Sequence, residues 1–297
     1  MNKNLISVVI PAHNEESVIA KAINSLLGST YKNYEIIVVN DGSTDRTKRI
    51  VENLIIKYPK KIKLISYEQG HSPAFARNRG AEAAKGDILF FLDADDWVRD
   101  DTLESIIKAF ENHKGIDFIV GIREPIIPKN WRRIFLYYWA TMRKFGINNE
   151  QIAIKTPYCP YIMKTNKFFK LGKFNENLYY DEDNDFRIRL IKMVIPKLLT
   201  NKIHFYTDMG HDKKDFLKRC KNTAKHSTKN ISNLFKIIIF LFISTMTFPM
   251  FFLIVFSYMF LKSHDLLISF STPFLYVIRR ILDIYYFLKI NNVFDYF

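Results

Sequence analysis

The chain has 297 residues, of which 48% are hydrophobic and 25% are charged, and its formal net charge is +14. This composition excludes a chain that is disordered throughout, and the length suits one large domain or two smaller ones. Its two cysteines, Cys159 and Cys220, lie far apart and have no neighbours at metal-ligand spacing. The sequence therefore predicts neither a disulfide framework nor a zinc knuckle.

The first hundred residues alternate short apolar runs with amphipathic segments. Strands are predicted at residues 6–10, 35–40, 63–66 and 87–92. The segments between them carry apolar residues at helical spacing; we expect the second helix to follow Ser43 and the third to open with Ser72 and Pro73. This alternation predicts an α/β fold with a parallel sheet and right-handed crossovers. The N-terminus lacks the pattern of a secretory signal peptide, so we expect this part of the chain to be cytosolic.

Polar residues follow three of the predicted strands. In open α/β sheets, ligands bind at the carboxyl ends of the strands, so these residues form one candidate site. Neither G-x-G-x-x-G nor a Walker pattern follows the first strand, and the phosphates of a nucleotide would need another means of neutralisation. The residues after the first, second and fourth strands are Pro11 to Glu15, Asn40 to Ser43 and Asp93 to Asp96.

Three carboxylates stand within four positions directly after the fourth predicted strand. Asp93 and Asp95, at i and i+2, can gather one divalent cation that also bridges the oxygens of a diphosphate. The alternative is a solvated approach to the next helix, which Asp101 would cap together with Glu104. We assign Asp101 to the cap and predict that Asp93 and Asp95 bind metal and nucleotide.

A second acidic cluster opens another predicted helix. It contains Asp181, Glu182, Asp183 and Asp185. The helix macrodipole favours carboxylates there, and an i,i+4 pair of Asp183 with Arg187 would account for them without any catalytic role. That explanation suffices for Asp181 and Asp185. Crowding of the remaining carboxylates would raise one pKa, as a general base requires.

The last part of the chain has the pattern of a membrane region. Residues 237–261 carry no charge and exceed the roughly 20 residues that cross a bilayer, so a spanning helix is predicted. Residues 266–288 form a second span or an interfacial helix. Lys and Arg exceed Asp between residues 186 and 230, which marks the cytoplasmic side of a cell membrane. Nucleic-acid binding is the competing explanation of the basic charge, but most of the excess lies beside the span.

Four motifs together resemble the family 2 glycosyltransferases of the GT-A fold, over about residues 5 to 220. They are "VVIPAHNEE", "IIVVNDGSTDRT", "ARNRGAEAAKGDILFFLDADD" and "GKFNENLYYDEDNDFRIRL". The resemblance implies a Rossmann-like, mostly parallel sheet flanked by helices. We therefore expect a catalytic domain at residues 1–230, followed by the membrane region that the apolar runs predict at residues 231–297. It also implies a nucleotide-diphosphate sugar donor, Mg²⁺ or Mn²⁺, and inversion at the sugar carbon.

The resemblance also implies roles for individual residues. Asp183 matches the family's catalytic base, with Glu182 as the alternative. Asp93 and Asp95 match the D-x-D motif, with Asp95 as the direct metal ligand, and His211 lies where relatives place a histidine near the metal. The donor nucleotide would contact Pro11, Ala12, Asn14, Glu15, Asp41, Arg77 and Asp93.

The predicted function is therefore a membrane-anchored inverting glycosyltransferase. Because the chain has "LKRCK" where processive relatives carry Q-x-x-R-W, we expect transfer of a single sugar. The acceptor would be a polyprenyl phosphate, a lipid-linked glycan or a glycolipid in cell-surface polysaccharide biosynthesis. The alternatives are a metal-dependent nucleotidyltransferase and a non-catalytic, membrane-bound nucleotide-sugar-binding protein.

Overall fold

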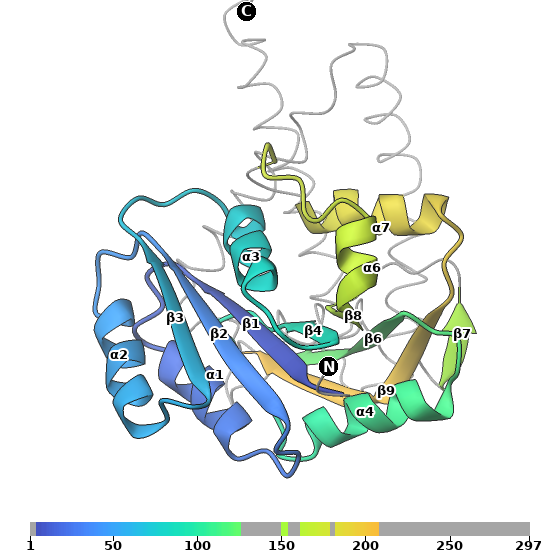
Figure 1. The fold of residues 1–297 in the computed structure, drawn as a ribbon, viewed down its shortest axis with the longest axis horizontal. Helices are drawn as coiled ribbons and strands as arrows, with labels where there is room; N and C mark the ends of the chain where they lie inside the picture. Colours follow the sequence, from blue (N-terminus) through green and yellow to red (C-terminus); the bar gives the residue numbers. More distant parts are fainter. Residues whose placement is uncertain (1–3, 126–149, 154–160, 179–181, 208–297) are drawn as a thin grey trace, which may run out of the picture. The chain divides into compact units, whose positions relative to one another are not determined.

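A computed structural model describes residues 4–125, 150–153, 161–178 and 182–207 of the chain (Figure 1). These residues belong almost wholly to one compact unit, which comprises residues 1–124 and 143–208. Helices flank a single sheet of nine strands. The α/β class predicted from the alternating pattern is confirmed.

The first half of the sheet is parallel, as predicted. β1 pairs with β2 on one side and with β4 on the other, and β2 pairs with β3. β1 and β2 are rich in Val and Ile, and β1, β2 and β4 are almost completely buried, which is typical of the central strands of a parallel sheet covered on both faces. The elements are β1 (Ile6–Ala12), α1 (Ile19–Leu27), β2 (Tyr34–Asp41), α2 (Thr47–Lys57), β3 (Ile62–Tyr67), α3 (Pro73–Glu82) and β4 (Ile88–Phe91).

The second half of the sheet is antiparallel, so the sheet is mixed rather than mostly parallel. Its strands follow in the order β3-β2-β1-β4-β8-β6-β9-β5, with β7 paired to β9. β8 pairs antiparallel with both β4 and β6, and β9 pairs antiparallel with β5 and β7. These strands are β5 (Asp96–Val98), β6 (Phe118–Pro125), β7 (Gln151–Ala153), β8 (Ile162–Lys164) and β9 (Lys197–Thr207).

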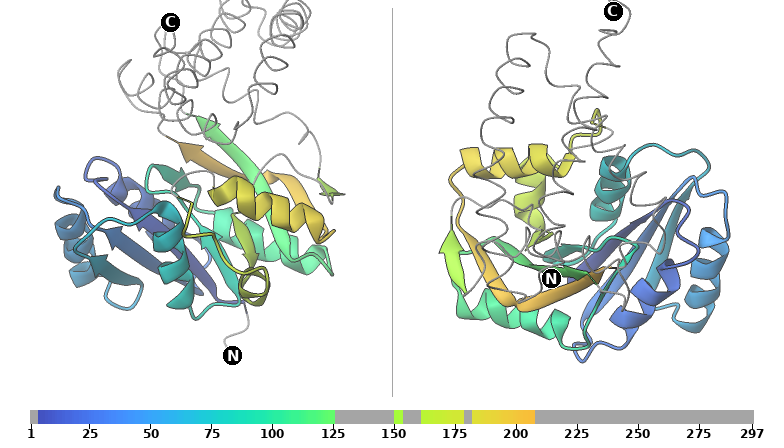
Figure 2. Two further views of the ribbon diagram at one scale, coloured as in Figure 1. Left: turned by 90° about the horizontal axis from the view of Figure 1, so that it is seen from above. Right: turned by 180° about the vertical axis from the view of Figure 1, so that it is seen from behind.

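Two helical layers cover the two faces of the sheet, and alternate strand residues fill two separate cores (Figures 1 and 2). Val8 and Phe90 pack on the face of α1, α2 and α4, whereas Val9 and Phe91 pack on the face of α3, α6 and α7. This is the two-residue period of a strand with both faces buried. The remaining helices are α4 (Thr102–Asn112), α6 (Thr165–Lys170) and α7 (Glu182–Lys192).

The predicted start of α3 is confirmed and that of α2 is corrected. Ser72 caps α3 by accepting a hydrogen bond from the backbone N–H of Phe75, with Pro73 in the first turn. α2 begins at Thr47 rather than directly after Ser43. The carboxylate of Asp45 accepts hydrogen bonds from both the backbone N–H and the hydroxyl of Thr47. Asp45, and not Ser43, thus satisfies the first backbone N–H of the helix.

The membrane prediction concerns residues outside those described. The segments at 237–261 and 266–288 both lie beyond residue 207. Among the residues that the structure describes, none of the helices is long and apolar enough to cross a bilayer. The predicted spans therefore stay predictions.

Gly80 allows α3 to approach β1 closely. A Cβ atom at this position would lie 2.2 Å from Cγ1 of Val9 and 3.2 Å from Cγ2 of Val39, and both side chains are buried. We expect Gly80→Ala to lower the free energy of unfolding by about 1–3 kcal/mol, because the added methyl group must push α3 off the sheet. Chemical denaturation of the full chain, followed by circular dichroism, measures this loss.

Gly28→Ala is the matched control for Gly80→Ala. A Cβ atom there would first meet the carboxylate tip of Asp100, which can move aside. We expect the control to stay within about 0.5 kcal/mol of the parent. Equal losses in the two variants would contradict the close approach of α3 and β1.

Candidate active site

The acidic stretch after β4 lies where β4 ends and β5 begins. Asp93 is half-buried, Asp95 occupies the turn, and Asp96 is buried as the first residue of β5. Asp96 pairs with Thr207 of β9, so the stretch joins the parallel half of the sheet to the antiparallel half. The three carboxylates are therefore held at the carboxyl end of a central strand, where ligands of α/β sheets bind.

Arg77 of α3 connects this acidic stretch to the start of α7. Its Nη2 donates to Oδ1 of Asp93 at 2.9 Å, and its Nη1 donates to Oε1 of Glu182 at 2.6 Å. The guanidinium is almost completely buried, and Glu182 is 8% exposed. Two residues of the third motif, Arg77 and Asp93, are thus in direct contact with each other and, through Arg77, with Glu182 of the fourth.

Arg123 of β6 is a member of the site that the sequence analysis missed. Its Nε donates to Oδ2 of Asp96 at 2.8 Å, and its Nη2 contacts both Asp93 and Asp96. A sequence signal for it exists: Arg123 ends an otherwise apolar strand run, and a buried cation requires a carboxylate partner. The sequence does not reveal which carboxylate that is.

The two arginines give neighbouring aspartates opposite protonation tendencies. Burial alone would raise the pKa of Asp93, but Arg123 and Arg77 together hold it well below its usual range. Burial raises the pKa of Asp96 to about 7 despite the opposing charge of Arg123, and repulsion from Asp93 and Asp95 adds to this effect. Asp93 is therefore ionised at neutral pH, whereas Asp96 gains and loses its proton near neutral pH.

The donor set of this cluster fits a divalent cation. Four carboxylates (Asp93, Asp95, Asp96 and Glu182) surround two guanidinium groups, so negative charge is in excess. Oδ1 of Asp96 is buried and has no hydrogen-bond partner among the described residues. Within the described ranges, no group of three or more His, Cys, Asp or Glu side chains is placed to hold a metal ion by itself. Mg²⁺ commonly takes one or two carboxylates and completes its shell with substrate phosphates and water, which suits this arrangement.

The start of α7 presents the second acidic group. Asp183 is half-buried, and its Oδ1 accepts from the backbone N–H of Asn184 at 2.7 Å. Asp185 pairs with Arg189 at i+4, which gives Asp185 a structural role through a different pair from the predicted one of Asp183 with Arg187. Phe186 is fully buried and fixes the helix on the sheet. Asp183 therefore follows directly on Glu182, the residue that Arg77 ties to Asp93.

The loops after β1 and β2 contact each other through the residues predicted to hold the nucleotide. Pro11 and Ala12 are the last residues of β1. Asn14 has a positive φ of 58°, and its Oδ1 accepts from the backbone N–H of Thr44 at 2.8 Å. The backbone N–H of Glu15 donates to Thr47 Oγ1 of α2 at 2.7 Å. The two loops thus form one connected edge.

Asp41, at the end of β2, is engaged by His71. Its Oδ2 accepts from the backbone N–H of His71 and its Oδ1 from the ring Nδ1–H, both at 2.9 Å. The Asp41 side chain is 7% exposed, whereas that of His71 is 42% exposed and stacks on Phe75. A hydrogen bond between Asp41 and the base of the donor nucleotide stays a prediction. A nucleotide base at this position would also contact His71. The other predicted histidine, His211, lies outside the described residues.

A comparison with family models matches residues 7–174 to one described as glycosyl transferase family 2. An uncharacterized glycosyltransferase of Haemophilus influenzae is 41% identical over 114 residues, which are 38% of this chain and 45% of the relative. The minor teichoic acid biosynthesis protein GgaB of Bacillus subtilis is 29% identical over 246 residues, 77% of this chain and 26% of its own length. The chain thus matches less than half of the length of each of these relatives.

Solved structures share the fold. S. aureus TarS in complex with UDP-GlcNAc superposes with a TM-score of 0.56 at 21% identity, covering 77% of this chain and 67% of that one. The mannosyltransferase PcManGT from Pyrobaculum calidifontis, in complex with GDP-Man and Mn²⁺, gives a TM-score of 0.58 at 18% identity and covers 75% and 61%. At these identities the likeness establishes the fold, a mixed α/β sheet with flanking helices.

Proposed function

The chain belongs to glycosyl transferase family 2, and from this premise we propose that it transfers one sugar from a nucleotide-diphosphate donor to an acceptor hydroxyl, with inversion. The match over residues 7–174 contains the first three of the four sequence motifs, and it confirms the family that they indicated. It also favours glycosyl transfer over the nucleotidyltransferase alternative. The observation that carries the proposal is the contact of Arg77 with both Asp93 and Glu182, because it joins the proposed donor site to the residue directly before the proposed base, Asp183.

The proposed reaction is a single displacement at the sugar carbon. The acceptor oxygen attacks the anomeric carbon and forms the new glycosidic bond while the bond from that carbon to the diphosphate oxygen breaks. The bonding electrons leave with the nucleoside diphosphate, and the hydroxyl proton passes to the carboxylate of Asp183. A base on the face opposite the leaving group is what inversion requires. Glu182 is less suited to this role, since it is already ion-paired with Arg77.

Asp95 is the residue proposed to hold Mg²⁺ or Mn²⁺, with Asp93 beside it. Such an ion, when bound, neutralises charge on the departing diphosphate. Arg77 and Arg123 keep Asp93 ionised and fix its orientation through both oxygens. The complex of PcManGT with GDP-Man and Mn²⁺ and that of TarS with UDP-GlcNAc support this proposal.

We propose a membrane-held acceptor in the synthesis of a cell-surface glycan. The support is the sequence similarity to GgaB, a minor teichoic acid biosynthesis protein, and the apolar stretches of the C-terminal region. The catalytic unit would then lie at the cell membrane and face the cytoplasm, the compartment in which nucleotide sugars are made. A polyprenyl phosphate, a lipid-linked glycan and a glycolipid are the acceptor classes consistent with this placement.

A donor panel tests the proposed activity. The full-length protein, purified in detergent, is incubated with UDP- and GDP-sugars and with Mn²⁺, Mg²⁺ or EDTA, and released nucleoside diphosphate is measured. We expect one donor to be consumed in the presence of a divalent ion and at least tenfold more slowly with EDTA. Release of pyrophosphate from a sugar phosphate and a nucleoside triphosphate, without consumption of any nucleotide sugar, would instead identify a nucleotidyltransferase.

A further inference from the structure

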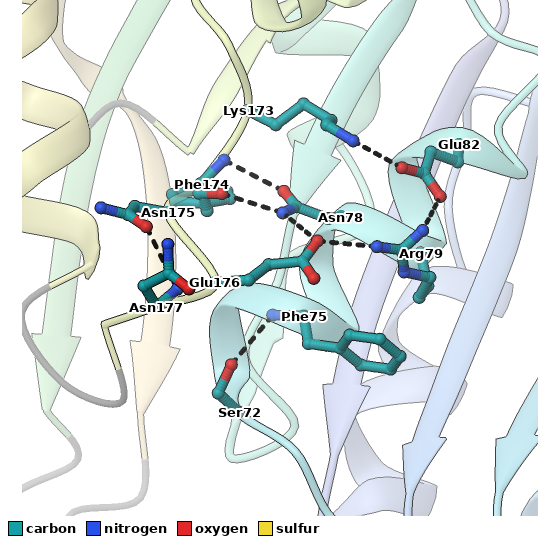
Figure 3. Close-up of polar contacts among 10 residues, drawn as sticks. All are labelled: Ser72, Phe75, Asn78, Arg79, Glu82, Lys173, Phe174, Asn175, Glu176 and Asn177. Carbon is teal, nitrogen blue, oxygen red and sulfur yellow. Dashed lines mark hydrogen bonds and ion pairs between the residues drawn. The ribbon is translucent and has the colours of Figure 1, made fainter.

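Three consecutive residues of α3 bind the segment that precedes α7 and the first residue of α7. Arg77 binds Glu182, Asn78 binds Phe174, and Arg79 binds Glu176. Figure 3 shows Asn78 and Arg79 facing the segment around Phe174 and Glu176. α3 therefore contacts this segment both before α7 and at its first residue.

Asn78 is the buried centre of these contacts. Its side-chain Oδ1 accepts from the backbone N–H of Phe174 at 3.0 Å, and its Nδ2 donates to the backbone carbonyl of the same residue at 2.9 Å (Figure 3). Nδ2 also donates to Oε1 of Glu176 at 2.8 Å. Asn78 is 1% exposed, so its two bonds to Phe174 are shielded from water, whereas its bond to Glu176 is only partly buried. A carboxamide is suited to this position because it supplies a donor and an acceptor together.

Phe174 connects this peptide to both sides of the site. Its ring centroid lies 5.3 Å from that of Phe91, the last residue of β4, and 4.8 Å from that of Phe186 in α7. β4 leads directly to Asp93, and α7 begins with Glu182. A shift of Phe174 would therefore move α7 relative to the acidic stretch.

The outer contacts of the same segment are more exposed. Arg79 donates to Glu176 and Glu82, and Lys173 pairs with Glu82 at 2.8 Å, all through side chains about a third exposed. Ion pairs at such positions contribute little to stability. Arg189 of α7 also donates to the backbone carbonyl of Lys173 at 2.6 Å. Among the residues of α3, it is Asn78 that makes the buried contacts with the segment.

We propose that Asn78 is a positioning residue for the catalytic carboxylate at the start of α7. By fixing Phe174 and Glu176, it sets where α7 begins and hence how Asp183 lies relative to Asp93. The inference rests on the proposed function of Asp183 as the base. Turnover is sensitive to this geometry because a base misplaced by about 1 Å can cost roughly a hundredfold in rate.

The variant Asn78→Asp tests the proposal. It keeps an oxygen for the N–H of Phe174, but it loses the Nδ2 donor and places a carboxylate against the carbonyl of Phe174 and against Glu176. We expect kcat per donor-binding site to fall about 10- to 100-fold, while KM for the donor stays within about threefold. The full-length protein is assayed in detergent with UDP-GlcNAc and with GDP-mannose. Calorimetric titration with the donor that is consumed then gives the number of donor-binding sites, by which kcat is divided.

A second substitution should restore the lost contact. In Asn78→Asp combined with Glu176→Gln, the glutamine amide can donate to the new carboxylate, and its oxygen still accepts from Arg79. If Asn78→Asp loses more than tenfold in kcat, we expect the double variant to regain at least tenfold in kcat. If Asn78→Asp loses only about tenfold, we expect the double variant to regain about threefold. Glu176→Gln alone and Lys173→Gln are the controls, both expected within about threefold of the parent.

Several outcomes overturn the proposal. One is a lowered melting temperature in Asn78→Asp with an unchanged kcat per donor-binding site, since this shows a structural role alone. Another is a lost kcat that the double variant fails to raise. If Asn78→Asp does not fold, Asn78→Ser replaces it with the same expected split between kcat and KM. If Asp183→Asn keeps full turnover, the proposed base falls and this inference with it; if Asp183→Asn is inactive and Asn78→Asp is not, only the inference falls.

Discussion

Asp183→Asn is expected to lower kcat by about a thousandfold and to leave donor affinity within about threefold of the parent. General bases contribute roughly 10²- to 10⁴-fold to enzymatic rates, and asparagine keeps the size and the hydrogen bond to Asn184 while it cannot take up the acceptor proton. The measurement is release of nucleoside diphosphate at saturating donor, together with calorimetric donor binding. A loss in kcat without a loss in binding separates a chemical role from a binding role.

Asp185→Asn is the matched control for this prediction. Asp185 lies in the same turn of α7 but is paired with Arg189, so we expect its kcat to stay within about threefold. Glu182→Gln tests the alternative base. If Asp183→Asn keeps its turnover while Glu182→Gln loses it, the base is Glu182 and the proposed role of Asp183 is wrong.

Arg77→Met is expected to destabilise the protein strongly. The buried guanidinium pairs with Asp93 and Glu182, and although burial opposes its charge, the two carboxylates hold the pKa of Arg77 well above its ordinary value. Removing one partner of a buried ion pair costs about 3–5 kcal/mol, because the remaining charges are left uncompensated. Such a loss is a large part of the roughly 5–15 kcal/mol that a domain has in total. Urea denaturation of the full chain measures it.

Arg77→Lys and Arg46→Met frame this result. A lysine carries its charge on one nitrogen and lacks the planar fork through which Nη1 and Nη2 of Arg77 each reach a carboxylate, so we expect Arg77→Lys to recover less than half of the lost free energy. Arg46 pairs with Glu16 in an exposed ion pair, and Arg46→Met should cost far less free energy of unfolding than Arg77→Met. Equal losses in Arg77→Met and Arg46→Met would contradict the buried bridge between Asp93 and Glu182.

The parallel half of the sheet could be predicted from the sequence, and the antiparallel half could not. The runs around Val8, Val38 and Phe90 are apolar, separated by amphipathic segments, and joined locally, so their period and order are visible in the chain. β5, β7 and β8 have three residues each, too few to show a period. Their partners also lie far away in sequence, as in the pairing of Asp96 with Thr207.

The acidic residues of the candidate site could be identified from the sequence, but residues that hold them in place were missed. Asp93 and Glu182 stand in acidic clusters that a sequence displays directly. Arg123 and Asn78 act through partners 30 and 96 residues away, and nothing local identifies those partners. A buried arginine or asparagine shows that a partner must exist, whereas only the fold shows which one it is.

Calorimetric titration with the donor identified by the panel tests the central claim most directly, since it reports the metal and the nucleotide sugar together. We predict that the full-length protein binds this donor with Mn²⁺ and at least tenfold more weakly with EDTA, and that Asp95→Asn loses most of the difference. Equal affinity with Mn²⁺ and EDTA, unchanged in Asp95→Asn, would contradict a cation held by the carboxylates after β4.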